Sequence, residues 1–222
     1  MALLHHAFLF SAAEFLDQCR PCWRNGSLDE EALHEAAVRA RVSPSPAQLS
    51  FLELIRFDPD WWMARGADEE EFRWLMVVLS GTPSLRHAPS LSKRDPSGFI
   101  LLREALAALS WEPAETAAGI RGRYLENLLT AAGFPVPEPL ARGLRLMPGY
   151  LSPSEADKMV NHLIESGQDR ERMARASDAV AAYCRDRAIA PLSSAHEVID
   201  DFSTMLNAAK QSGDSLLMGV FD

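Results

Sequence analysis

The sequence predicts a mainly α-helical, α+β-like protein, in which about ten helices accompany a small β-sheet formed from the terminal strands. Helix-starting motifs recur along the chain, apolar residues between them repeat at helical spacing, and a short apolar run of strand length lies near each end. A length of 222 residues favours one domain over two. We therefore expect residues 1–222 to form a single α-dominant globular unit.

Serine followed three residues later by glutamate marks the predicted helix starts. In such a capping box, the serine oxygen accepts a hydrogen bond from a free amide, and the glutamate reaches back to the serine amide. The pairs that we interpret as helix starts are Ser11 with Glu14, Ser27 with Glu30, and Ser152 with Glu155. Ser45 before Pro46 opens a further predicted helix. Predicted stops lie at Pro21, Gly81, Gly133, Gly167, Pro191 and Gly213.

Between these marks, apolar residues fall on one face of each predicted helix. Examples of such stripes are Ala12, Phe15, Leu16 and Cys19; Ala156, Met159, Val160 and Leu163; and Val198, Phe202, Met205, Leu206 and Ala209. Residues 72–79 and 99–109 are apolar almost all round, so we expect these two stretches in the core.

The apolar runs at residues 3–10 and 215–221 have strand length, and each is bounded by a predicted helix. Since a lone strand is unstable in water, we expect the two to pair, with room for a third short strand. Residues 147–151 are predicted to form a turn. The polar, proline-marked stretch 80–97 is the expected place for any subdomain break.

The net charge of −9 disfavours non-specific binding to nucleic acid or to anionic lipid. No apolar run approaches the roughly 20 residues that span a membrane. The first ten residues lack the basic region of a signal peptide, and three cysteines do not make a disulfide framework. We therefore expect a cytoplasmic protein with reduced cysteines, no membrane contact and no nucleic-acid partner.

Cys19 and Cys22 form a C-x-x-C motif, for which three interpretations stand. A redox site needs the first thiol at a helix N-terminus, whereas the start at Ser11 places Cys19 in the last turn of a helix. A zinc site needs four ligands, and candidates such as His34 lie at no recognisable metal spacing. Core packing is favoured, because Cys19 continues an apolar stripe.

Two histidines lie at helical spacing from carboxylates. Glu31 and His34 form the Glu-x-x-His pair of di-iron bundles, but the second copy that such a centre needs is missing. His196 and Asp200 lie four residues apart on a face that the apolar stripe turns towards solvent. We expect solvated surface roles for both histidines, and also for His162.

Trp61 and Trp62 are adjacent, and Asp58 and Asp60 precede them. Neighbouring residues of a helix point about 100° apart, so both tryptophans cannot enter the same core. We therefore expect Asp58, Asp60, Trp61 and Trp62 to bind a partner, because tryptophan is enriched in binding hot spots and acids suit a basic surface. The alternative is that both rings bury their edges between helices.

The sequence has no G-x-S-x-G elbow, no Walker A motif and no G-x-G-x-x-G loop. The preferred hypothesis is a non-catalytic interaction protein without a cofactor: an inhibitor, an immunity-type protein or an accessory subunit. The alternative is a metal- or thiol-dependent enzyme that uses Cys19, Cys22 and histidines. A helical transcription regulator is disfavoured by the acidic charge and by the lack of a basic recognition helix.

Overall fold

A computed structural model describes residues 6–29, 31–32, 34–35, 38, 45–49, 51, 75, 77–89, 97–109, 125–138, 141, 149–188 and 194–219. Of the residues that the structure describes, 69% are helical, and a small antiparallel sheet accompanies them. A mainly helical fold with a small sheet is therefore confirmed. Eight helices are counted in the described part of the chain, fewer than the predicted number of about ten. No helix within these ranges is long and apolar enough to cross a membrane.

The chain divides into two compact units. Unit 1 comprises Met1–Ala7, Ala88–Gly122 and Tyr150–Asp222, and unit 2 comprises Phe8–His87 and Arg123–Gly149. The chain therefore passes from one unit to the other four times, and each unit contains segments that are far apart in the sequence. The expectation that residues 1–222 fold as one domain stays a prediction.

Four short strands form the main sheet, in the order β4-β1-β6-β5. Their bounds are His6–Phe10 for β1, Arg86–His87 for β4, Gly149–Leu151 for β5 and Ser215–Gly219 for β6. The runs expected near the two ends are thus neighbours, β1 beside β6. The turn expected at residues 147–151 is wrong at residues 149–151, which form β5, whereas residues 147 and 148 lie outside the described residues. Strands β1 and β4 are antiparallel, with Phe8 opposite His87 and Leu9 opposite Arg86.

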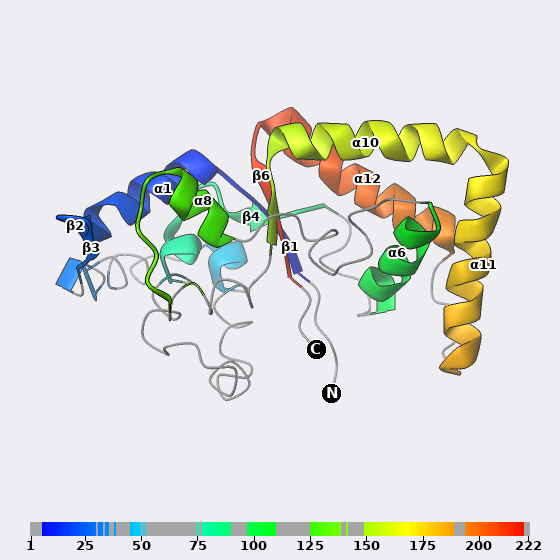
Figure 1. Cartoon of the computed structure of the whole chain (residues 1–222), viewed down its shortest axis with the longest axis horizontal. Helices are drawn as coiled ribbons and strands as arrows, with labels where there is room; N and C mark the ends of the chain where they lie inside the picture. The colour runs from blue at the N-terminus through cyan, green and yellow to red at the C-terminus, as the bar shows by residue number, and fades with distance from the viewer. Residues whose placement is uncertain are drawn as a thin grey trace. The chain divides into compact units, whose positions relative to one another are not determined.

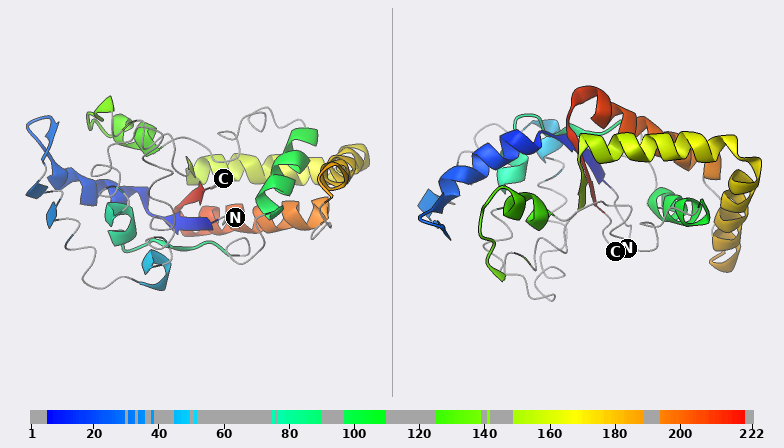
Figure 2. Two further views of the ribbon diagram at one scale, coloured as in Figure 1. Left: turned by 90° about the horizontal axis from the view of Figure 1, so that it is seen from below. Right: turned by 45° about the horizontal axis from the view of Figure 1, so that its top comes forward.

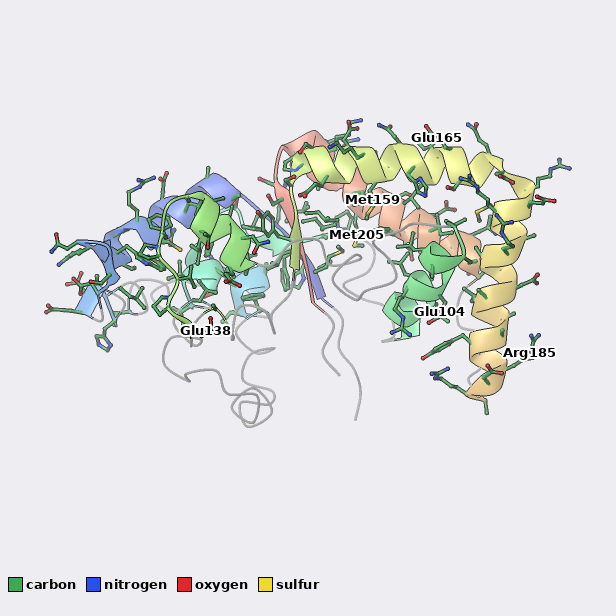
Figure 3. All side chains as sticks on the ribbon, viewed as in Figure 1. Glu104, Glu138, Met159, Glu165, Arg185 and Met205 are labelled. Atoms are coloured by element: carbon green, nitrogen blue, oxygen red, sulfur yellow. The ribbon has the colours of Figure 1, made fainter. Side chains whose placement is uncertain are left out.

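Unit 1 contains helices α6 (Ser97–Ala108), α10 (Pro153–Gln168), α11 (Arg170–Asp186) and α12 (Ala195–Ser212). Helix α10 lies along α12, and α6 packs against both α11 and α12 (Figures 1 and 2). Met159 of α10 lies on the side of that helix that faces α12 in Figure 3, and Met159 and Met205 are both buried. The predicted apolar stripes of α10 and α12 are therefore the faces that form this core.

The three long helices of unit 1 begin with complete caps. The predicted box of Ser152 and Glu155 is confirmed in both directions. A second box joins Ser194 and Glu197 at the start of α12, and Asp169 caps α11 by accepting from the amides of Glu171 and Arg172. The predicted stop at Gly213 is also confirmed, since Gly213 ends α12 with a φ of 70°.

Unit 2 begins with helix α1 (Ala12–Cys19) and the 3-10 helix η1 (Arg20–Cys22). A hairpin of β2 (Trp23–Arg24) and β3 (Ser27–Leu28) follows α1 and η1 (Figure 2). Its loop residues Asn25 and Gly26 both have positive φ, of 54° and 78°, as a two-residue type I′ turn requires. Helix α8 (Leu125–Ala131) belongs to the same unit.

Two of the predicted caps in unit 2 need correction. Ser11 does accept from the amide of Glu14, but a Glu14 carboxylate oxygen accepts from the amide of Ser84, 3.1 Å away. The amide of Ser11 donates instead to Ser84 Oγ at 2.6 Å. Ser84, which is distant in the sequence, is therefore the acceptor that the capping box predicted Glu14 to be. Ser27 is part of β3 and starts no helix. Asp29 Oδ1 accepts from the amides of Glu31 and Ala32, and so caps the helical residues that follow.

Candidate functional site

The C-x-x-C motif lies where α1 passes into η1. As predicted, Cys19 is the last residue of α1, and Cys22 is the last residue of η1. Both side chains are fully buried, with 0% exposure, and neither cysteine is in a disulfide. The Cys22 Sγ–H lies 3.8 Å from the carbonyl oxygen of Gln18 and 3.8 Å from that of Ala32. The motif is therefore part of the core of unit 2.

The environment of Cys19 favours the thiol over the thiolate. Burial raises the pKa of Cys19 well above its ordinary value, because the thiolate would lose its hydration, and the nearby Cys22 raises the pKa further. The C-terminal end of α1 also disfavours a negative charge. Since the thiolate is the nucleophile and the metal ligand, this arrangement does not activate Cys19 for catalysis at neutral pH.

The structure does not bring His34 into a ligand cluster with these cysteines. His34 and Glu31 are both exposed, which agrees with the solvated helix face expected for them. Among the residues that the structure describes, no group of three or more His, Cys, Asp or Glu side chains is placed to hold a metal ion.

The other two histidines of interest are in unit 1. His196 is exposed near the start of α12, as predicted. His162 is half-buried on α10, where its Nε2 lies 3.4 Å from Ser166 Oγ. Ser166 itself is fully buried. A substrate cannot reach that hydroxyl, so the pair does not form an accessible nucleophile and base.

The helix starts of unit 1 are also poor candidates for an anion site. A helix N-terminus binds anions through its free amides and its dipole. At α10 and α12, the amide of the capping serine donates to Glu155 or Glu197, and the amide of that glutamate donates to the serine oxygen. At α11, two amides donate to the carboxyl group of Asp169. An external phosphate or carboxylate would have to displace these groups.

Asp58, Asp60, Trp61 and Trp62, the expected partner-binding residues, lie outside the described residues. Their role therefore stays a prediction from the sequence. The sequence contains five tryptophans, and of these the structure describes Trp23 in detail.

The sequence did not predict the contact between Trp23 and the proline-containing segment 134–139, which follows α8. Trp23 Nε1 donates to the carbonyl oxygen of Pro135 at 2.8 Å. The Trp23 and Phe134 rings are 5.1 Å apart between centroids. The signal in the sequence was the proline content of residues 134–139, which predicts extended backbone with free carbonyl groups. The proline content does not indicate that Trp23 is the residue that donates to one of these carbonyl groups.

Comparison with protein-family models, with curated proteins and with solved structures finds no match for this chain. The described residues offer buried thiols, capped helix starts and solvated histidines. The geometry of these thiols, helix starts and histidines does not favour catalysis by them. We therefore infer the function from the net charge and the exposed residues.

Proposed function

We propose that this protein is a non-catalytic, cytoplasmic binding protein whose partner is another protein with a basic surface. Inhibitors, immunity-type proteins and accessory subunits act in this way. The observation that carries the proposal is the acidic excess. The net charge is −9, and Asp and Glu outnumber Lys and Arg in unit 1 and in unit 2 alike. A charge spread in this way attracts a basic partner and raises the rate of encounter.

Helix α12 is an example of an element in which acidic residues outnumber basic ones. It has three acids, Glu197, Asp200 and Asp201, against Lys210 as its one basic residue. Lys210 forms an ion pair with Asp157 of α10, which offsets its charge. Asp200 is exposed. The carboxylates of α12 therefore dominate the charge that this helix presents.

The residues proposed to make the direct contact are Asp58, Asp60, Trp61 and Trp62. Tryptophan contributes large apolar area at binding hot spots, and flanking acids select basic partners. The surrounding sequence is also acidic, since Asp68, Glu69, Glu70 and Glu71 follow within a few residues. None of the three cysteines is in a disulfide, which fits a reducing compartment such as the cytoplasm.

Native mass spectrometry of protein purified gently from its own host tests this proposal. We expect a complex with a second polypeptide, identified by peptide sequencing. Its association rate should fall about tenfold or more between low and physiological salt, because screening weakens steering between opposite charges. A chain that carries metal ions and no second polypeptide would contradict the proposal.

Matched variants separate the proposed contact from overall charge. The double variant Asp58→Asn with Asp60→Asn should slow association several-fold, while Trp61→Ala should mainly speed dissociation. Asp200→Asn with Glu165→Gln, at exposed positions of unit 1, changes the net charge equally and is the control. Equal effects of the two charge pairs would remove residues 58–62 as the contact and leave only the charge.

A further inference from the structure

The binding proposal leaves the Cys19 and Cys22 pair unused. The two side chains share one buried environment, at the end of α1 and at the end of η1. In a 3-10 helix, residues i and i+3 are eclipsed, so their side chains lie on the same side. Cys19 precedes η1 directly and has α-helical φ and ψ, of −70° and −35°. The two cysteines are therefore in the i and i+3 relation across one helical turn.

This spacing suits a disulfide. Helical geometry places the Cα atoms of residues i and i+3 roughly 5–6 Å apart. Disulfide-bonded cysteines have Cα separations of about 4.4–6.8 Å. The electrostatic effect of Cys22 on Cys19 is a second sign that the two sulfur groups are close. The backbone can thus accept the bond with a local adjustment.

The Cys22 thiol has a structural role in the reduced protein. Its Sγ atom lies 3.8 Å from each of two carbonyl oxygens, of Gln18 in α1 and of Ala32 beyond the hairpin, and can donate its proton to either of them. A disulfide has no S–H group, so oxidation removes this donor. The oxidation state of the Cys22 sulfur therefore decides whether η1 can donate a hydrogen bond to the carbonyl oxygen of Ala32.

We propose that Cys19 and Cys22 are a redox-sensitive pair, which a small-molecule disulfide oxidises to an intramolecular disulfide, with release of the tie to Ala32. Burial makes the pair a slow sensor and not a catalyst, because a reagent reaches it only when α1 and η1 open locally. The proposal does not depend on the identity of any binding partner.

The chemistry balances with the disulfide as the only oxidant. One cysteine loses its proton, and its thiolate attacks a sulfur of the reagent, which forms a mixed disulfide and expels one reagent thiolate. The second cysteine thiolate then attacks the protein sulfur of that mixed disulfide and expels the other reagent thiolate. The protein loses two protons and two electrons, and the reagent becomes two thiols.

The test uses the full chain with oxidised glutathione, followed by intact mass measurement and peptide mapping under acid quench. We expect the protein to lose the mass of two hydrogen atoms, with a link between Cys19 and Cys22 that a reducing agent reverses. The rate should rise with pH, because the thiolate is the attacking form. Cys184→Ser should behave like the wild type, whereas Cys19→Ser and Cys22→Ser should not lose this mass.

Hydrogen exchange tests the structural consequence without any substitution. Amides of residues 29–35 should exchange about two- to fivefold faster in the oxidised protein, the factor expected for one weak hydrogen bond. Cys22→Ala should reproduce this increase in the absence of oxidant. A link that forms only in denaturant, a stable glutathione adduct in place of the link, or unchanged exchange at residues 29–35 would each overturn the proposal.

Discussion

The helix starts of unit 1 and the α1 region of unit 2 use polar side chains in different ways. In unit 1, Ser152 and Ser194 are each paired with a glutamate three positions away, and Asp169 binds amides two and three positions away. In unit 2, α1 and its neighbours have local caps at Ser11 and Asp29, and they also have bonds that join distant parts of the chain. Gln18 reaches Gly81, 63 positions away, and Trp23 reaches Pro135, 112 positions away.

This difference explains which interactions a sequence can reveal. A capping box lies within four residues and has a fixed pattern, so the order of the amino acids is enough to recognise it. A long-range bond leaves no such pattern. Glu14 shows the consequence, because its sequence context predicts a local bond, whereas its carboxylate accepts from Ser84.

The largest expected effect comes from the cores of the two units. Phe15 in α1 and Phe202 in α12 are both fully buried, so replacement of either by alanine should cost about 3–5 kcal/mol of unfolding free energy. Urea unfolding should be followed by tryptophan fluorescence and by far-ultraviolet circular dichroism. If residues 1–222 are one domain, each substitution lowers the midpoint of both signals together.

The fluorescence signal reports mainly on unit 2, which contains Trp23, Trp61, Trp62 and Trp74, whereas unit 1 contains Trp111. A Phe202→Ala protein in which the dichroism transition moves and the fluorescence transition stays would show that the units unfold separately. In that case the prediction of a single domain would be wrong.

A smaller effect is expected from a long-range polar bond of unit 2. The buried Gln48 donates from Nε2 to the carbonyl oxygen of Thr82 at 3.3 Å, and its Oε1 accepts from the amide of Ser45. Gln48→Met keeps the length of the side chain and leaves both backbone groups without this partner. We expect a loss of about 1–3 kcal/mol in urea unfolding. Gln168→Met, at an exposed position, is the matched control and should stay within about 0.5 kcal/mol.

The smallest effect is expected from a local bond of unit 1. Ser194→Ala removes the oxygen that accepts from the amide of Glu197 at 3.2 Å, and helix caps of this kind contribute about 1 kcal/mol. Ser194→Asp should restore most of the stability, since aspartate is an equally good cap. If Ser194→Ala lowers the free energy of unfolding more than Gln48→Met does, the expectation that the long-range bond of Gln48 contributes more to stability than the local cap is wrong.

Much of the secondary structure could be predicted from periodicity and caps. The stripe through Val198, Phe202 and Met205 is buried, and the strands near the two ends are neighbours. Strand β5 was missed because it begins at Gly149, directly after Pro148, and this pair of residues favours a turn. Such a short strand is stabilised by its neighbours in the sheet and not by local preference.

The candidate site was less predictable than the fold. The burial of Cys19 follows from its place in the α1 stripe, and the sequence indicates it. The tie from Cys22 to Ala32 depends on how the hairpin turns the chain back. The Asn25 and Gly26 pair is a strong hairpin signal, so this turn could have been predicted, but the contact that it produces could not.

The neighbour relation of β1 and β6 has a consequence for synthesis on the ribosome. Strand β1 is made roughly 200 residues before β6, an interval of about 10–40 s at ordinary rates of translation. During that time, the edge of β1 that β6 will cover has unpaired backbone groups on an apolar segment. The nascent chain therefore has an interval in which chaperones compete with aggregation, and this interval ends when β6 is made and pairs with β1.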